Sequence, residues 1–328
     1  MITLGIETSC DETSASIIDS GKNILSAKIF SQADIHKKFG GVVPEVASRN
    51  HALKIRPIVE EVINDAKISV NDIDLIGVTN SPGLIGALFV GVSFAKGLSY
   101  TLKKPLIPVN HLTAHILSGE IENEDLTPPY AALVISGGHT HLFHVSKSYA
   151  FTLISKTIDD AIGETFDKIS KTLGFGYPGG PEIEKNASLG DETKISYPIA
   201  MKNELNFSFS GLKTSVINSY NLEKYTKEDI SASFQKTAVD TLIHKVRLAY
   251  KNQKFSKLVV AGGVACNGYL RKRLQNELKN IKVFFPSRGL CTDNGVMVAY
   301  TAYKFFNKRI FMGFKSKAFD RDENIKLF

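Results

Sequence analysis

Two histidines in a short segment are the residues best suited to chemistry. His111 and His115 stand four positions apart, and on a helix that spacing places both side chains on one face, where they can share a metal ion. Asp293 is the best candidate for a third ligand, because it stands in a tight turn before an apolar helix. Imidazole and carboxylate ligands suit Zn or Fe. Two alternatives remain: Asp293 could cap that helix, and the histidines could be ordinary surface or core residues.

Two short polar segments could bind an anion. Residues 8–13 lie between two strand-like runs and offer backbone N–H groups, while Asp11 and Glu12 could hold a cation or accept a proton. The segment Ser136-Gly137-Gly138-His139 has the same character, since its glycines permit close approach to a phosphate or carbamoyl oxygen. Ordinary polar hairpins are the alternative for both segments.

A third segment favours nucleotide binding at the end of a buried strand. Gly262 and Gly263 end that strand, and Asn267 follows at a helix start. In an open α/β sheet ligands bind beyond such strand ends, so a purine or ribose could lie there. Neither the G-x-G-x-x-G nor the G-x-x-x-x-G-K-[ST] spacing is present, which disfavours a Rossmann oxidoreductase and a P-loop kinase. The turn at residues 176–181 could close over the same nucleotide or could join two helices.

The elements that must position these residues follow one plan twice. In each half an antiparallel three-stranded meander precedes alternating helices and strands. The expected strands are residues 2–7, 13–18, 24–30, 75–79, 106–109, 130–136, 142–145, 151–155, 257–261 and 283–285. The expected helices are residues 44–66, a helix from about 85, the histidine helix, and residues 161–172, 211–220, 227–252, 267–279 and 294–307.

Length and composition bound the domain organisation. A chain of 328 residues exceeds the size at which one core usually keeps growing. We expect an N-terminal lobe of residues 1–125, completed by the C-terminal helix of 296–328, and a C-terminal lobe of residues 126–295. Residues 315–328 look like an exposed tail. Three widely spaced cysteines form no disulfide framework and indicate a reducing cytoplasm.

Charge and hydropathy narrow the class of partner. No secretion signal begins the chain, and the apolar stretch at residues 84–102 is interrupted by glycines and a lysine, as in a buried helix rather than a membrane span. We therefore expect a cytoplasmic protein without a membrane partner. The net charge of +7 is compatible with a polyanion. Its candidate basic clusters are Lys37-Lys38, Lys103-Lys104 and Arg271-Lys272-Arg273.

Taken together, these motifs make the chain resemble the TsaD family, which transfers a threonylcarbamoyl group to tRNA. The resemblance runs from Met1 to about Asn307, and its motifs occur in the family's order. Besides the segments above, it rests on residues 5–13, 163–168, 177–181, 207–214 and 291–295.

The resemblance implies a fold and a set of site residues. The fold is α/β, two-lobed, of the actin, Hsp70 and sugar-kinase (ASKHA) type, with a nucleotide between the lobes. His111, His115 and Asp293 would bind one divalent metal, with Fe²⁺ favoured over Zn²⁺. Ile135, Ser136, Gly137, Gly138 and His139 would contact the donor, threonylcarbamoyl-AMP. Asp167, Gly180 and Asn267 would hold its adenosine part, with Glu184 a further candidate at the ribose. Glu184 stands where many relatives have Asp.

The implied reaction is transfer from threonylcarbamoyl-AMP to N6 of adenine 37 in ANN-decoding tRNA. Asp11 or Glu12 would act as a base or hold a water molecule. The segment at residues 207–214 and Thr292 resemble the bacterial branch, which implies TsaB-like and TsaE-like partner proteins. A non-catalytic nucleotide-binding switch or a kinase with the same fold is the alternative. A metallopeptidase is a distant third, because Leu112 replaces the Glu that a zincin motif requires.

Overall fold

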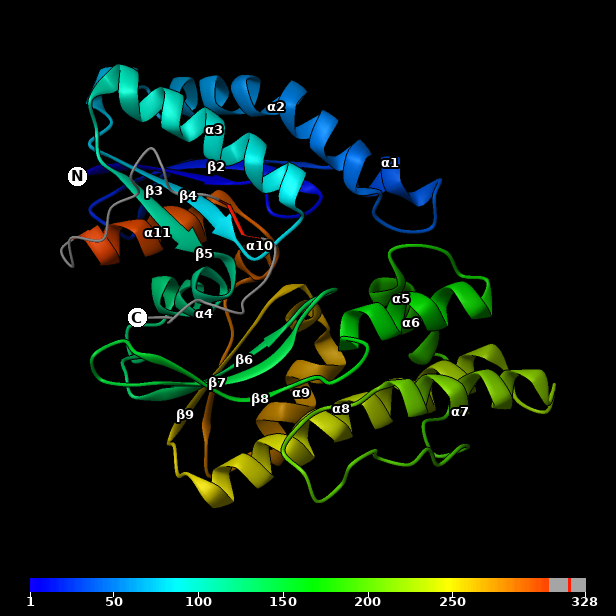
Figure 1. Ribbon diagram of the computed structural model, residues 1–328. Helices are drawn as coiled ribbons and strands as arrows, with labels where there is room; N and C mark the ends of the chain where they lie inside the picture. The colour runs from blue at the N-terminus through cyan, green and yellow to red at the C-terminus, as the bar shows by residue number, and fades with distance from the viewer. Residues whose placement is uncertain (307–317, 320–328) are drawn as a thin grey trace. The chain divides into compact units, whose positions relative to one another are not determined.

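The computed structural model describes residues 1–306 and 318–319 (Figure 1). The chain divides into two compact units: the first comprises Met1–Glu124 with Thr292–Phe328, and the second comprises Asp125–Cys291. Residues 307–317 and 320–328 lie outside the described residues. They include most of the expected C-terminal tail and much of the segment 296–328 that we expect to complete the N-terminal lobe. Each unit contains one five-stranded sheet.

The sheet of the first unit has the order β3-β2-β1-β4-β5. Strands β1, β2 and β3 form the expected antiparallel meander, and β4 and β5 add to it in parallel. The bounds are β1 Ile2–Glu7, β2 Glu12–Asp19, β3 Asn23–Ser31, β4 Leu75–Ser81 and β5 Leu106–Asn110. Because β1, β4 and β5 are parallel, their carboxyl ends meet at one edge, where His111 and the polar loop at residues 8–11 begin.

Helices cover both faces of this sheet (Figure 1). On one face lie α2, which contacts β2, and α3, which contacts β4, and these two helices also contact each other. On the other face α4 and α11 pack together. Their bounds are α1 Ala33–Lys37, α2 Pro44–Asp65, η1 Val70–Asp72, α3 Ile85–Leu102, α4 His111–Glu122 and α11 Gly295–Phe306. The strands are therefore buried on both sides: Leu4, Ile6, Ile76 and Val78 are inaccessible to solvent.

The second unit repeats this topology. Its sheet has the order β10-β9-β6-β7-β8, with an antiparallel meander of β6, β7 and β8 and a parallel extension through β9 and β10. The strands are β6 Tyr130–Ile135, β7 Thr140–Val145, β8 Phe151–Lys156, β9 Lys257–Ala261 and β10 Lys282–Phe284. The two-half plan expected from the sequence is confirmed at the level of each sheet.

The helices of the second unit supply most of its core. The longest, α8, lies among α6, α7 and α9, and contributes buried Phe234, Val239, Leu242 and Val246. The bounds are α5 Ile162–Leu173, α6 Gly179–Ala187, α7 Ser210–Asn221, α8 Lys227–Asn252, η2 Gly263–Cys266, α9 Gly268–Glu277 and α10 Arg288–Cys291.

Helix α6 differs from the sequence-based expectation. The Gly-Pro composition of residues 176–181 indicates a turn, yet α6 begins at Gly179 and contains Gly180 and Pro181 in its first turn. Proline is tolerated there, because the first backbone N–H groups of a helix have no partner within the helix. Gly180 is thus part of a helix start rather than of a linking turn.

Helix α3 is long and apolar enough to span a membrane by length and composition, and a third of its residues are buried. Its buried side consists of small and aliphatic residues, such as Ala87, Leu88 and Val92, packed on α2 and β4. Its opposite side exposes Ile85, Phe89 and Tyr100. These contacts are those of a helix that covers a sheet and leaves one apolar side open.

Candidate metal centre and substrate-binding loops

The histidine helix begins directly at the end of β5. The side chain of Asn110 caps α4 by accepting a hydrogen bond of 3.0 Å from the Thr113 backbone N–H. The cap fixes the first turn, which contains His111, and one turn later His115 follows on the same face. Both side chains are buried, His115 completely.

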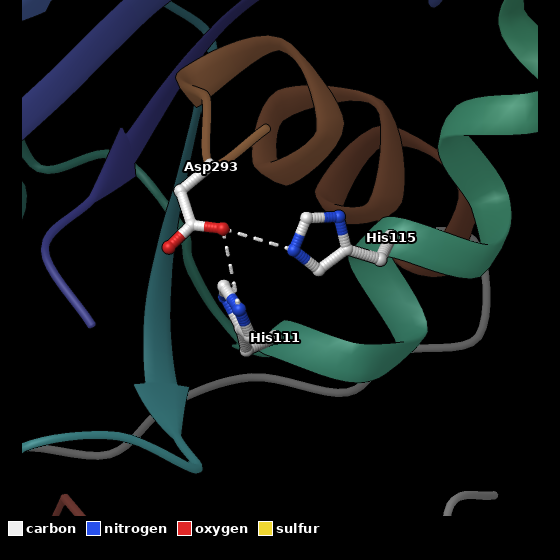
Figure 2. Close-up of side chains that lie close together, drawn as sticks. All are labelled: His111, His115 and Asp293. Carbon is white, nitrogen blue, oxygen red and sulfur yellow. Dashed lines mark hydrogen bonds and ion pairs between the residues drawn. The ribbon is translucent and has the colours of Figure 1, made fainter. Parts of the chain in front are cut away.

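Asp293 completes a group of three potential metal ligands (Figure 2). Its Oδ1 lies 3.0 Å from Nε2 of His115 and 3.6 Å from Nε2 of His111. One ligand atom from each residue falls within 4.8 Å of the others. Two imidazole nitrogens and one carboxylate oxygen converging in this way are a donor set that fits a divalent transition metal.

Helix α11 is capped by Asn294 rather than by Asp293. The backbone N–H of Met297 donates to Oδ1 of Asn294 at 2.9 Å. The alternative in which Asp293 serves as the N-cap is therefore wrong. The neighbouring asparagine satisfies the helix terminus, and the Asp293 carboxylate is directed to the histidines.

A buried carboxylate that the sequence analysis missed lies behind His111. Oε2 of Glu7, at the end of β1, lies 3.2 Å from Nδ1 of His111 and accepts a hydrogen bond of 2.6 Å from Thr79. Its other oxygen accepts from the Ser9 backbone N–H at 2.6 Å, and the Ser9 hydroxyl lies 3.1 Å from the same ring nitrogen of His111. These contacts fix the ring so that Nε2 faces Asp293.

Electrostatics keep Glu7 ionised and His115 neutral. Burial would raise the pKa of Glu7, but the charge of His111 and the hydrogen bonds from His111 and Thr79 hold it below its usual value. Burial, followed by repulsion from His111, lowers the pKa of His115. A neutral imidazole is the form that binds a metal.

The candidate acid-base loop adjoins this centre. Burial, and then the charges of Asp293 and Asp11, raise the pKa of Glu12 to about 10. At pH 7 this shift favours the neutral carboxylic acid form of Glu12. His51 supports the loop, because its ring nitrogens lie 2.9 Å from the Cys10 carbonyl oxygen and 2.8 Å from the Thr13 hydroxyl.

In the second unit, the loop after β6 is a tight turn with open space beside its glycines. The Ser136 backbone N–H donates to the His139 carbonyl at 2.8 Å, and the His139 N–H donates to the Ser136 hydroxyl at 3.2 Å. Apart from their chain neighbours, no atom of the described residues lies within 4 Å of the Cβ position that a side chain would have at Gly137 or Gly138. This space would allow a ligand to approach the backbone. Ile135 lies beside Gly262, whose φ of 93° favours glycine.

Asp167 positions the start of α6. Its Oδ1 accepts a hydrogen bond of 2.7 Å from the Gly179 backbone N–H. A side chain at Gly179 would collide with Asp167 and Phe166, whereas the space beside Gly180 is open. The structure therefore brings two predicted site residues, Asp167 and Gly180, to one helix terminus.

Glu184 and Asn267 meet at the start of α9. Oε1 of Glu184 accepts from the Gly268 backbone N–H at 2.7 Å, and Asn267 donates to Gln235 at 2.9 Å while capping α9 through Leu270. Glu184 and Gln235 also line a cavity of about 370 Å³, together with Tyr269. The sequence did not point to Gln235 or Tyr269, because both stand on helices without a recognisable motif.

Two members of the basic cluster in α9 are engaged within the second unit. Arg271 donates to the Ala265 carbonyl at 2.6 Å, and Arg273 pairs with Asp240 at 2.6 Å. These contacts argue against phosphate binding by Arg271 and Arg273, because both guanidinium groups already hold neighbouring segments.

The fold and the donor set define a class: an α/β protein of the ASKHA type with a candidate metal centre. Solved structures share this fold, with low sequence identity. The activator of 2-hydroxyisocaproyl-CoA dehydratase from Clostridium difficile matches with a TM-score of 0.59 and 15% identity, over 96% of this chain and 100% of that one. Full-length HypF matches with a TM-score of 0.65 and 17% identity, over 97% of this chain and 47% of that one.

Sequence comparison gives the family. A family model described as TsaD, tRNA N6-adenosine threonylcarbamoyltransferase, matches residues 23–300. The enzyme of that name from Thermosipho africanus is 51% identical over 319 residues, covering 94% of this chain and 96% of its own length. The one from Clostridium novyi is 48% identical over 92% of this chain and 91% of its own length. The chain belongs to the TsaD family.

Proposed function

We propose that this protein transfers the threonylcarbamoyl group from threonylcarbamoyl-AMP to N6 of adenine 37 in ANN-decoding tRNA. The observation that carries the proposal is the convergence of His111, His115 and Asp293 in a chain matched to the TsaD family over residues 23–300. A nucleotide-binding switch or a kinase of the same fold would not need this donor set.

In this proposal His111, His115 and Asp293 hold one divalent metal. Fe²⁺ is favoured over Zn²⁺ from the family resemblance, and the donor chemistry suits both. When bound, the metal supplies Lewis-acid polarisation and orientation of the carbamoyl group. Glu7 fixes the His111 ring, so that the ligand nitrogen is presented before the metal arrives.

The second unit would bind the donor. Residues 135–139 contact the threonylcarbamoyl-adenylate, with Gly137 and Gly138 admitting it to the backbone. Asp167, Gly180, Glu184 and Asn267 hold its adenosine part. Support comes from the cavity that Glu184 lines together with Gln235, since Gln235 accepts a hydrogen bond from Asn267.

The chain's own carboxylates would handle the proton. As N6 of adenine attacks the carbamoyl carbon and AMP leaves, the amine must lose a proton, and Asp11 and Glu12 are the candidate acceptors. Glu12 can accept it only when ionised, and its pKa is raised first by burial and then by the charge of Asp293. A bound metal that compensates the Asp293 charge would favour the ionised form.

The partner surface would lie on the open sides of α2 and α3. Leu53 is 70% exposed, Phe89 66% and Tyr100 73%, and these large apolar side chains lie on two helices that contact each other, as in an interaction surface. From the family resemblance, the partners are TsaB-like and TsaE-like proteins in the cytoplasm. Phe89→Asp should weaken co-purification with a TsaB-like protein, whereas Leu189→Asp, at an equally exposed position in the second unit, should not.

The direct test is a transfer assay with purified protein, threonyl-labelled threonylcarbamoyl-AMP, tRNA and the candidate partners. We expect label at adenine 37 of ANN-decoding tRNA and free AMP in equal amounts. Nucleotide hydrolysis or phosphoryl transfer with no label in tRNA would instead favour the switch or kinase alternative.

A further inference from the structure

Two of the three cysteines, far apart in sequence, lie on two short helical segments of the second unit that pack together. Cys266 ends η2 and Cys291 ends α10. Sγ of Cys266 lies 3.7 Å from the Arg288 carbonyl oxygen, and Sγ of Cys291 lies 3.5 Å from that of Pro286. The Cys266 sulfur therefore reaches the short helix that Cys291 ends, and a disulfide forms where packing brings two cysteines this close.

A fixed cation accompanies the thiol pair. One guanidinium nitrogen of Arg271 lies 3.1 Å from Sγ of Cys291 and 2.9 Å from the Pro286 carbonyl oxygen. Its Nε donates to the Ala265 carbonyl at 2.6 Å, beside Cys266. Arg271 therefore bridges the two segments that carry the thiols, and its positive charge favours a thiolate between them.

The two thiols are suited to different roles. The neighbouring Cys291 thiol, and then the charges of Arg271 and Arg288, lower the pKa of Cys266 against the effect of burial. Cys266 is partly exposed, whereas Cys291 is completely buried. A partly exposed thiolate beside a buried second thiol is the arrangement of an attacking and a resolving cysteine.

We propose that Cys266 and Cys291 form a reversible dithiol–disulfide site that reacts with low-molecular-weight disulfides. The Cys266 thiolate attacks one sulfur of the external disulfide, forming a mixed disulfide and expelling one thiolate. Cys291 loses its proton and attacks the Cys266 sulfur, which forms the internal disulfide and expels the second thiolate. Two protein thiols are oxidised and one external disulfide is reduced to two thiols.

The third cysteine offers an internal control. Burial, and then the charges of Asp11, Asp293 and Glu12, raise the pKa of Cys10 well above its usual value. Cys10 should therefore react at least about tenfold more slowly than Cys266 with the same reagent.

The test uses the full-length protein with oxidised glutathione at neutral pH, followed by intact mass and peptide mapping. We expect an internal disulfide joining Cys266 and Cys291, with a mass loss of two hydrogens that dithiothreitol reverses. Cys291→Ser should stop at a glutathione adduct on Cys266, and Cys266→Ser, a change at a partly exposed position, should leave Cys291 unmodified.

Three results would overturn the proposal. In the first, Cys10 reacts as fast as Cys266. In the second, the wild-type protein accumulates the glutathione adduct without an internal bond. In the third, Cys291 is modified in the folded Cys266→Ser variant, with folding verified by its thermal transition.

Discussion

At the scale of single residues, the metal centre depends on side chains that bring the ligands into position. Glu7 and Ser9 contact Nδ1 of the His111 ring, while Asp293 lies on the Nε2 side. Glu7 is held in turn by Thr79 of β4. The ring is therefore oriented by contacts within the first unit.

Replacing Glu7 should weaken metal binding without removing a ligand. In Glu7→Gln the acceptor for Nδ1 of His111 loses its charge, and we expect about a 10–100-fold loss of affinity. Titration with Zn²⁺ or Co²⁺ followed by metal analysis measures it. Thr79→Val removes one hydrogen bond to Glu7 and should lower the metal affinity less. Equal metal affinity of the wild type and Glu7→Gln would show that this carboxylate does not position His111.

Some residues of the site can be predicted from the sequence, and others cannot. His111 and His115 were predictable because the i, i+4 spacing is local, and Asp293 because it directly precedes an apolar helix. Glu7 was not, since its contact with His111 joins positions 104 apart through a parallel sheet. The only available signal was a carboxylate at the end of an otherwise apolar strand.

At the scale of elements, the two Asp residues after β8 connect α5 and α7. Asp160 accepts from Lys168 and Lys213 at 2.8 and 2.6 Å, and Asp159 accepts from Ser208, Ser210 and the Phe209 backbone. Although burial raises the pKa of Asp160, the hydrogen bonds and charges of the two lysines lower it overall.

This lowered pKa predicts an acid-sensitive contribution to stability. A carboxylate with a depressed folded-state pKa stabilises the fold above its unfolded-state pKa of about 3.9, and the stabilisation disappears as pH falls through the folded-state value. Asp160→Asn should cost about 1 kcal/mol at pH 7, since both lysines remain partly solvated, and less at pH 3, which lies below the unfolded-state pKa. Urea unfolding at the two pH values tests it, with exposed Glu223→Gln as the control; an equal loss at both would contradict the ionic origin.

Element types followed from periodicity, but helix starts rich in glycine and proline did not. Helix α8 has a Thr226 cap and long apolar periodicity, and its bounds of Lys227–Asn252 match the expectation. The composition of residues 176–181 predicts a turn, although Gly179, Gly180 and Pro181 form the first turn of helix α6. What stabilises α6 there is tertiary: the Asp167 carboxylate holds the Gly179 N–H.

At the scale of the whole molecule, the basic excess is unevenly distributed. Residues 125–291 contain 22 Lys and Arg against 15 Asp and Glu, whereas the remaining segments contain 18 of each. The net charge of +7 therefore belongs to the second unit. Since Arg271 and Arg273 are engaged internally, the lysines of that unit are the stronger candidates for phosphate contacts.

Binding of tRNA should fall steeply with salt, because phosphate neutralisation releases counterions. Between about 50 and 200 mM salt we expect at least a tenfold loss of affinity in a filter-binding or fluorescence titration. Reversing Lys37, Lys38, Lys103 and Lys104 together should reduce that slope only if the first unit also contacts tRNA. A flat dependence for the wild type would assign the tRNA contacts to partner proteins and leave the basic excess a solubility feature.

The central claim is that transfer to tRNA depends on the metal held by His111, His115 and Asp293. The most direct measurement compares Asp293→Ala with Asn294→Ala for bound metal and for label transferred from threonylcarbamoyl-AMP to tRNA, under identical partner and tRNA concentrations. Asn294→Ala removes the α11 cap and should cost about 1 kcal/mol of stability, while retaining the metal and transfer. Asp293→Ala should lose both. Full metal content or undiminished transfer in a folded Asp293→Ala protein would contradict the account.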